Sequence, residues 1–192
     1  MAISAEDREK LSALATSAVA AAVKGLPLPS VDDPSGMLGE QRGCFVTLKN
    51  AGRLRGCIGT FQPDGPLGQS IVEMAFAAAT QDPRFVFDRI TPRELPNLTI
   101  EVSVLSPLAE TNEPEKLKVG THGIYIVRGP RAGCFLPEVA TEMGWGAEEF
   151  LDECCEGKAG LPRGAWRRAD AKVYLFTSEK FLCQSGLAEE HP

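Results

Sequence analysis

Apolar residues recur at helical spacing in two long segments, residues 5–24 and 67–81. Ser4 precedes the first segment as a capping residue does, and Lys24-Gly25 ends it. The second segment stops near Asp82-Pro83, because the residue before a proline avoids the helical region. We therefore predict an amphipathic helix in each segment.

Strand patterns account for much of the remaining chain. Residues 44–49 and 53–58 have strand composition and are separated by Asn50-Ala51-Gly52, which is typical of a tight hairpin. Residues 98–105 alternate between apolar and polar positions, so one face of this strand is predicted to lie in the core. The further predicted elements are a second hairpin at 122–128 and 132–136, helices at 137–143 and 147–155, and the last strand at 171–177.

The order of these elements determines the predicted fold class. Strands and helices do not alternate in the regular way that builds a parallel sheet, so we expect an α+β fold with a largely antiparallel sheet and packed helices. The segment 26–43 is rich in proline and glycine, and we interpret it as an ordered surface loop rather than a domain linker. A single domain is therefore expected over residues 1–192.

Composition is that of a packed globular protein. Hydrophobic residues make up 43% of the 192 positions and charged residues 24%. No segment approaches the roughly 20 apolar residues that a membrane span requires, and the first residues lack the basic start and apolar run of a secretory signal. We expect a soluble protein in the cytoplasm that does not bind membranes.

Charge and cysteine usage narrow the function classes. The net charge of −6 disfavours sequence-independent nucleic-acid binding, which depends on clustered Lys and Arg. Six cysteines without a Cys-x-x-Cys pair are interpreted as reduced thiols, and two histidines leave little material for a metal site. The glycine-rich nucleotide loops and the His-Glu-x-x-His pattern are missing too, so the sequence disfavours nucleotide hydrolysis and zinc proteolysis. Whether the protein uses a cofactor is unknown from the sequence.

A guanidinium and a thiol are predicted to be neighbours on the second strand. Alternation puts Arg53, Arg55 and Cys57 on one face, where Arg55 would favour the thiolate of Cys57, the nucleophilic form. Gly56 and Gly59 would permit a close backbone approach. From the residues alone, a packed cysteine is the stronger interpretation, and Arg55 would then form an ion pair with an acid such as Glu101.

Four further side chains are candidates for a site, each with a structural alternative. Glu101 and Ser103 share the non-core face of their strand about 7 Å apart, where they would meet one ligand or simply face solvent. His122 lies at the start of a predicted strand, where it would act as a base or serve as a hydrogen-bonded structural residue. Arg84 follows a helix end and suits either an anionic ligand or an interaction at the helix terminus.

The segment Leu54-Arg55-Gly56-Cys57-Ile58-Gly59-Thr60-Phe61 resembles the hallmark of the AMMECR family, protein A of bacterial and archaeal AmmeMemoRadiSam systems. Further similar segments are Asp82-Pro83-Arg84-Phe85, Glu101-Val102-Ser103-Val104-Leu105, Gly120-Thr121-His122-Gly123-Ile124 and Gly144-Trp145. The resemblance covers about residues 8–182. It implies two intimately packed subdomains with the signature near a cleft between them, and Memo-type and radical-SAM proteins as partners. Gly146 departs from the Trp-Asp pair of many relatives, which removes one carboxylate from that cleft.

Two functional hypotheses follow. In the first, the chain is an enzyme or enzyme subunit of an AmmeMemoRadiSam pathway, with Cys57 as nucleophile or acid–base group, Arg55 stabilising negative charge, and His122 or Glu101 moving protons. Arg55, Ser103 and Arg84 would bind the ligand. In the second, the chain is a non-catalytic module that binds a small anionic molecule or a partner protein, and Cys57 is merely packed.

Overall fold

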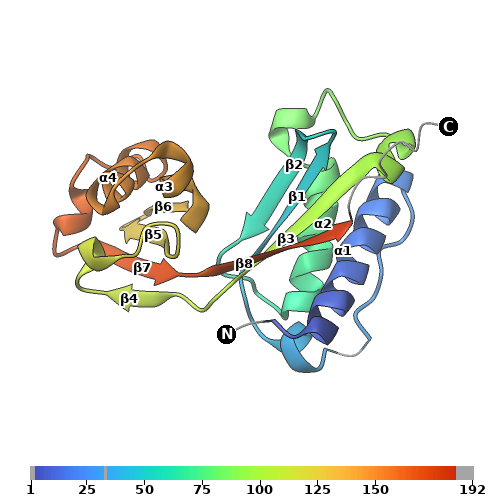
Figure 1. The fold of residues 1–192 in the computed structure, drawn as a ribbon, viewed down its shortest axis with the longest axis horizontal. Helices are drawn as coiled ribbons and strands as arrows, with labels where there is room; N and C mark the ends of the chain where they lie inside the picture. Colours follow the sequence, from blue (N-terminus) through green and yellow to red (C-terminus); the bar gives the residue numbers. More distant parts are fainter. Residues whose placement is uncertain (1–2, 33, 185–192) are drawn as a thin grey trace. The chain divides into compact units, whose positions relative to one another are not determined.

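The computed structural model describes residues 3–32 and 34–184, which divide into two compact units (Figure 1). The first unit contains the described residues up to 105 together with those from 179 onward, and the second contains residues 106–178. The chain therefore leaves the first unit once and returns to it. The single domain and the intimate packing of subdomains expected above stay predictions.

Two helices of the first unit form where the apolar periodicity predicts them. Helix α1 (Ala5–Lys24) begins at Ser4, whose hydroxyl accepts a hydrogen bond from the backbone N–H of Asp7 at 3.0 Å, and it ends at Gly25 in the left-handed region. Helix α2 (Leu67–Thr80) packs against α1. Both predicted helices are confirmed. The loop between α1 and the first strand contains a short 3-10 helix, η1 (Gly36–Gly39).

The first sheet lies against these helices. Its strands are β1 (Cys44–Asn50), β2 (Arg53–Thr60), β3 (Leu98–Leu105) and β8 (Ser178–Gln184), in the order β2-β1-β3-β8. Figure 1 shows α1 and α2 side by side on one face of the sheet. The core between them includes Leu11, Ile71, Val46, Leu48, Leu98, Ile100, Val102 and Val104. The alternation predicted for residues 98–105 is thereby confirmed, and the opposite face, called here the outer face, carries Thr47, Cys57 and Glu101.

The second unit has its own antiparallel sheet. Its strands are β4 (Ala109–Thr111), β5 (Gly123–Arg128), β6 (Arg131–Phe135) and β7 (Lys172–Phe176), in the order β4-β7-β5-β6. Helices α3 (Pro137–Met143) and α4 (Ala147–Gly157) belong to the same unit. Its core includes Ile124, Ile126, Phe150, Leu151, Trp166 and Val173. The α+β class with largely antiparallel sheets is confirmed.

Two strands were not predicted. Residues 171–177 were expected to hold the last strand, but β7 is followed by β8, which returns to the first unit. Strand β8 lies at the edge of its sheet and buries one large apolar side chain, Phe181, so its sequence lacks the apolar alternation of β3. Strand β4 is only three residues long. Among the described helices, none combines the length and apolarity needed to cross a membrane.

Candidate functional site on the outer face of the first sheet

A β-bulge displaces Arg55 from the alternation of β2. Leu48 is paired with Gly56 and Lys49 with Leu54, so Arg55 is the extra residue and has no partner on β1. The expectation that Arg55 and Cys57 share a face is therefore wrong, because the inserted residue shifts the alternation between them. Arg55 shares Glu94 with Asn50, a residue of β1, and is only 5% exposed.

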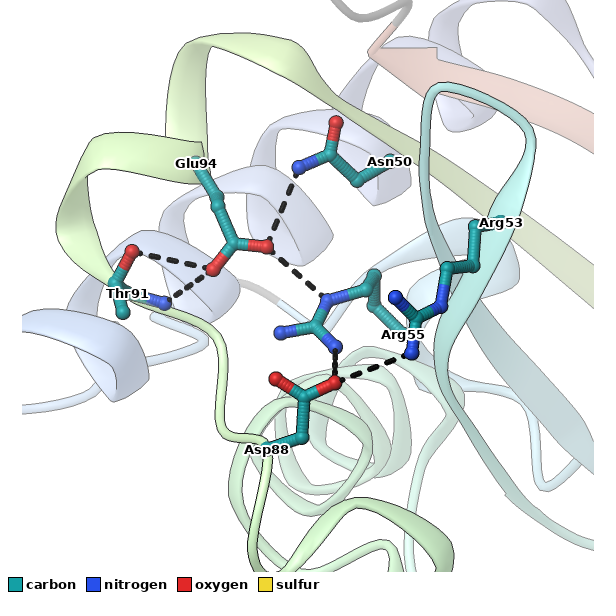
Figure 2. A network of polar contacts seen from close by, with 6 residues as sticks. All are labelled: Asn50, Arg53, Arg55, Asp88, Thr91 and Glu94. Atoms are coloured by element: carbon teal, nitrogen blue, oxygen red, sulfur yellow. Dashed lines mark hydrogen bonds and ion pairs between the residues drawn. The ribbon is translucent and has the colours of Figure 1, made fainter.

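Arg55 is held by two carboxylates that come from the chain after α2 (Figure 2). Its Nε donates to Glu94 Oε1 at 3.1 Å and its Nη1 to Asp88 Oδ2 at 2.7 Å. Burial by itself would lower the pKa of Arg55, but the hydrogen bonds and charges of Asp88 and Glu94 outweigh it and raise that pKa. Glu101, the partner suggested by the sequence, pairs instead with Lys49 at 2.8 Å.

Glu94 connects this ion pair to the backbone of its own segment. Its second oxygen accepts hydrogen bonds from the backbone N–H and the hydroxyl of Thr91, which completes a capping box at the start of η3 (Pro92–Asn97). Burial would raise the pKa of Glu94, but the hydrogen bonds from Thr91 and Asn50 and the charge of Arg55 lower it. Arg55 is therefore a structural cation that fixes the segment after α2 against the β1–β2 hairpin.

The two glycines of the signature allow close packing, as predicted. A Cβ atom on Gly56 would lie 2.0 Å from the backbone oxygen of Ala78 in α2. A Cβ atom on Gly59 would lie 2.2 Å from the ring of Phe45 on β1. Side chains at these positions would therefore push β2 away from its helix or from its neighbouring strand.

Asp82 and Arg84 satisfy the backbone hydrogen-bonding groups of Cys57 at the sheet edge. Strand β2 is an edge strand, so alternate backbone groups point away from β1. Cys57 N donates to Asp82 Oδ2 at 2.9 Å, and Arg84 Nη2 donates to Cys57 O at 3.2 Å. These two side chains take the place of a neighbouring strand for this one residue.

Asp82 is a buried carboxylate within this arrangement, with 3% of its surface exposed. It accepts from Arg84 Nε at 2.9 Å and from Arg84 Nη2 at 2.6 Å. The hydrogen bonds from Arg84, supported by the N–H of Cys57, outweigh burial and lower the pKa of Asp82 to about 2. The same contact with Asp82 raises the pKa of Arg84.

We expect Asp82 to stabilise the fold in a pH-dependent way. Its pKa is about 2 in the folded protein against an ordinary value of 3.8, so the folded state binds the proton less tightly. The stabilisation, about 2 kcal/mol, is fully present above pH 4–5 and is lost as the pH falls through about 2. The check is the free energy of urea unfolding of the wild type and Asp82→Asn at several values from about pH 6 to 2.5.

The difference between wild type and Asp82→Asn should shrink as the pH falls. Asp64 is an exposed aspartate in the same unit, so Asp64→Asn serves as the matched control and should change the free energy of unfolding by less than about 0.5 kcal/mol. A pH-independent difference for Asp82→Asn would contradict the prediction.

The side chain of Cys57 lies in a row of polar residues across three strands. Thr47 of β1 is in register with Cys57 of β2 on one side and with Glu101 of β3 on the other. Thr47 Oγ1 lies 3.3 Å from Cys57 Sγ, within hydrogen-bonding distance for sulfur. Cys57, Thr47 and Glu101 are all half-buried, and Lys49 Nζ lies 2.8 Å from Glu101 Oε2.

Of the residues proposed from the sequence, this row contains Cys57 and Glu101, and it adds Thr47 and Lys49. The hairpin turn alone could not have indicated Thr47, because an unbulged register would set Thr47 opposite Gly56, and only the bulge at Arg55 brings Cys57 opposite it. Arg84 lies beside the row through its bond to the Cys57 carbonyl, and its side chain is 53% exposed. Ser103 follows on β3 but is 3% exposed and in register with Phe45.

His122 belongs to the second unit and has a partner there. Its Nδ1 accepts a hydrogen bond from the backbone N–H of Lys118 at 3.1 Å, which closes the turn before β5. Gly146 is the N-cap residue of α4 in the same unit. Glycine is among the residues that suit a helix N-cap, so its presence at this position is compatible with local structure.

All six cysteines are free thiols. Burial raises the pKa of Cys44 to about 12 and that of Cys134 to about 11, and it also raises the pKa values of Cys154, Cys155 and Cys183. These five thiols stay protonated near neutral pH and are poor nucleophiles. Within residues 3–32 and 34–184, no group of three or more His, Cys, Asp or Glu side chains is arranged to hold a metal ion.

Comparison with known proteins shows to which family this chain belongs. The sequence profile of the AMMECR1 family matches residues 12–181, which include the bulged strand and both glycines. This chain belongs to the AMMECR1 family. Two archaeal relatives are a protein of Methanothermobacter thermautotrophicus, 43% identical over 164 residues (82% of this chain and 83% of the relative), and protein MK0488 of Methanopyrus kandleri, 46% identical over 156 residues (77% and 74%).

A solved structure shows the same AMMECR1 fold. The crystal structure of the uncharacterized protein PH0010 from Pyrococcus horikoshii aligns with a TM-score of 0.82 at 40% sequence identity. The alignment covers 94% of this chain and 93% of PH0010. The family resemblance seen in the signature is confirmed over nearly the whole chain.

Proposed function

We propose that this chain is an enzyme, or a subunit of one, that uses the thiol of Cys57 as a nucleophile or acid–base group. The observation that carries the proposal is the 3.3 Å contact between Cys57 Sγ and Thr47 Oγ1 on the outer face of the sheet. A hydroxyl at this distance can donate to a thiolate and stabilise the reactive form.

The surroundings of Cys57 suit such a role. Its backbone is held on both sides, by Asp82 at the N–H and by Arg84 at the carbonyl, so the side chain starts from a fixed position. The guanidinium of Arg84 is paired with Asp82 but is 53% exposed, so its exposed edge can donate a hydrogen bond to an anionic substrate. Glu101 is two strand spacings of about 5 Å each from Cys57, so it would exchange protons with a bound substrate rather than with the thiol itself.

The remaining site candidates are not used in this proposal. Arg55 is neutralised by two carboxylates, Ser103 is buried opposite Phe45, and His122 closes a turn in the second unit. An AmmeMemoRadiSam modification pathway, with Memo-type and radical-SAM proteins as partners, is the proposed context. What supports that context is membership of the family.

We expect Cys57 to be the first of the six cysteines to be alkylated by iodoacetamide in the folded protein. Thr47→Val keeps the branched shape but removes the hydroxyl, and it should slow the reaction roughly fivefold near neutral pH, the effect of a hydrogen bond of about 1 kcal/mol. The measurement is peptide mass spectrometry of a time course, with Cys57→Ser to confirm the modified position.

Thr99→Val on β3 is the matched control, because Thr99 is paired with Lys49 and not with Cys57 in the register. It should leave the rate unchanged. A Cys57 that stays unmodified from about pH 6 to 9, or a buried cysteine that reacts first, would sink the proposal.

A non-catalytic binding module is the second candidate, and the half-exposed guanidinium of Arg84 favours it. In that case the anionic ligand binds at Arg84 and Cys57 contributes only packing. With inorganic phosphate as the probe in calorimetry, Arg84→Gln would abolish binding and Cys57→Ala would leave it intact. Loss of phosphate binding with Cys57→Ala would count against this candidate.

A further inference from the structure

A phenylalanine side chain stands entirely in solvent on the segment after α2. Phe87 has 102% of its reference surface exposed, and the neighbouring Val86 has 40%. Three residues further on, Ile90 is buried in the core of the first unit. A Phe side chain can remove about 150–250 Å² from water when it is buried, so leaving one fully exposed forgoes a large stabilisation.

The segment that carries Phe87, residues 84–93, is fixed at several points along its length. At its start, Arg84 is bonded to Asp82 and to the carbonyl of Cys57. In its middle, Asp88 accepts from the buried Arg55, as Figure 2 shows. At its end, Thr91 is bonded to Glu94. A loop held in this way loses little conformational entropy when it binds a partner.

The segment is rich in arginine, and the carboxylates on it and beside it are already paired. The carboxylates Asp82, Asp88 and Glu94 all serve arginines of the protein itself. Arg89 and Arg93 are exposed on either side of the buried Ile90. Asp88 is half-exposed but is paired with Arg53 and Arg55. Three arginines against one aspartate give residues 84–93 a net charge of +2, although the whole chain has a net charge of −6.

We propose that residues 84–93 form a docking knob for a second protein, whose apolar pocket takes up Phe87 and whose pocket rim carries Asp and Glu side chains. Aromatic and arginine side chains dominate the binding energy of protein interfaces, and Phe87 with Arg89 and Arg93 supplies both kinds. A second copy of this chain is the poorer occupant, because a two-fold interface would bring the arginines of one knob against those of the other.

The knob is linked to the backbone of Cys57, the residue that carries the candidate thiol. Arg84, its first residue, bonds to the backbone carbonyl of Cys57, so a docked partner would lie at the β2 edge of the sheet. The inference goes beyond the proposed function and does not depend on it. A partner can dock here whether Cys57 reacts or is only packed.

The test begins with the full chain carrying the photoreactive residue benzoylphenylalanine in place of Phe87. It is irradiated in a lysate of the source organism, and the adduct is identified by mass spectrometry. Met143, an exposed apolar residue of the second unit, is the matched control position. We expect a protein adduct from position 87 that position 143 does not produce.

The captured protein is then purified and its affinity for the unmodified chain is measured by calorimetry. Phe87→Ala should weaken binding about 30-fold, as the loss of an interface anchor does. Arg89→Glu with Arg93→Glu should slow association about tenfold at low salt, with a smaller effect at high salt. Thermal unfolding of each variant should match the wild type, because the replaced side chains are exposed.

Several results would overturn the proposal. They are the absence of a specific adduct at position 87, an adduct only with nucleic acid or with a second copy of this chain, and an unchanged affinity of the purified partner for Phe87→Ala. If the affinity does not change when Arg89 and Arg93 are replaced, the partner's pocket has no acidic rim, and the proposed chemistry of the partner is overturned.

Discussion

Replacing Gly56 with alanine is expected to destabilise the protein by about 3 kcal/mol or more, or to prevent folding of the first unit. The added methyl group would lie 2.0 Å from the backbone oxygen of Ala78 and 2.9 Å from its carbonyl carbon. Backbone atoms within a helix cannot rotate away as a side chain can, so β2 or α2 has to move. Urea unfolding followed by circular dichroism measures the change in the free energy of unfolding.

Gly65→Ala is the matched control for this prediction. An added Cβ at Gly65 would meet nothing within 4 Å, and its φ is not in the left-handed region. The change there should be neutral or slightly stabilising, by a few tenths of a kcal/mol up to about 1, because alanine reduces the freedom of the unfolded chain. If Gly56→Ala has the same free energy of unfolding as Gly65→Ala, the prediction is contradicted, because β2 and α2 would then have room for the added methyl group.

Replacing Arg55 with alanine is expected to lower the free energy of unfolding by about 3 kcal/mol. Arg55 is 5% exposed, and its removal leaves Glu94 partly buried without its cation and Asp88 without its shorter ion pair. It also releases the segment after α2 from the β1–β2 hairpin. Urea unfolding measures the change in the free energy of unfolding. Limited proteolysis, with cleavage sites identified within residues 84–93, would show whether that segment has become accessible.

The chain offers a control that shares a partner with Arg55. Arg53 also contacts Asp88, at 3.4 Å, but its side chain is 74% exposed (Figure 2). Water screens such a pair, so Arg53→Ala should cost less than about 0.5 kcal/mol. Equal effects of the two substitutions would mean that the burial of Arg55 contributes nothing.

The residues of the family signature have different physical roles. Arg55 fixes a distant segment, Gly56 and Gly59 allow β2 to approach its neighbours, and the backbone of Cys57 is bonded to Asp82 and Arg84. All of these roles concern folding. The side chain of Cys57 lies on the outer face of the sheet beside Thr47. The proposed chemistry is placed at its thiol for this reason.

The fold class could be predicted because its evidence is local. Helical periodicity is a property of consecutive residues, and it located α1 and α2. The turn composition at Asn50-Ala51-Gly52 predicted the β1–β2 hairpin, and the alternation of residues 98–105 predicted which face of β3 is buried. Edge strands with few inward apolar side chains carry a weaker pattern, and for that reason β8 was missed.

The sequence by itself thus determined the family, the α+β class and the main helices and hairpins. It also identified Cys57, Glu101 and Arg84 as residues to examine. The tertiary structure alone decided their partners. Asp88 and Glu94 are 33 and 39 residues from Arg55, and Asp82 is 25 residues from Cys57. Polar side chains at such separations leave no periodic signal, and a single bulged residue reverses the alternation on which the predicted Arg55–Cys57 pair depended.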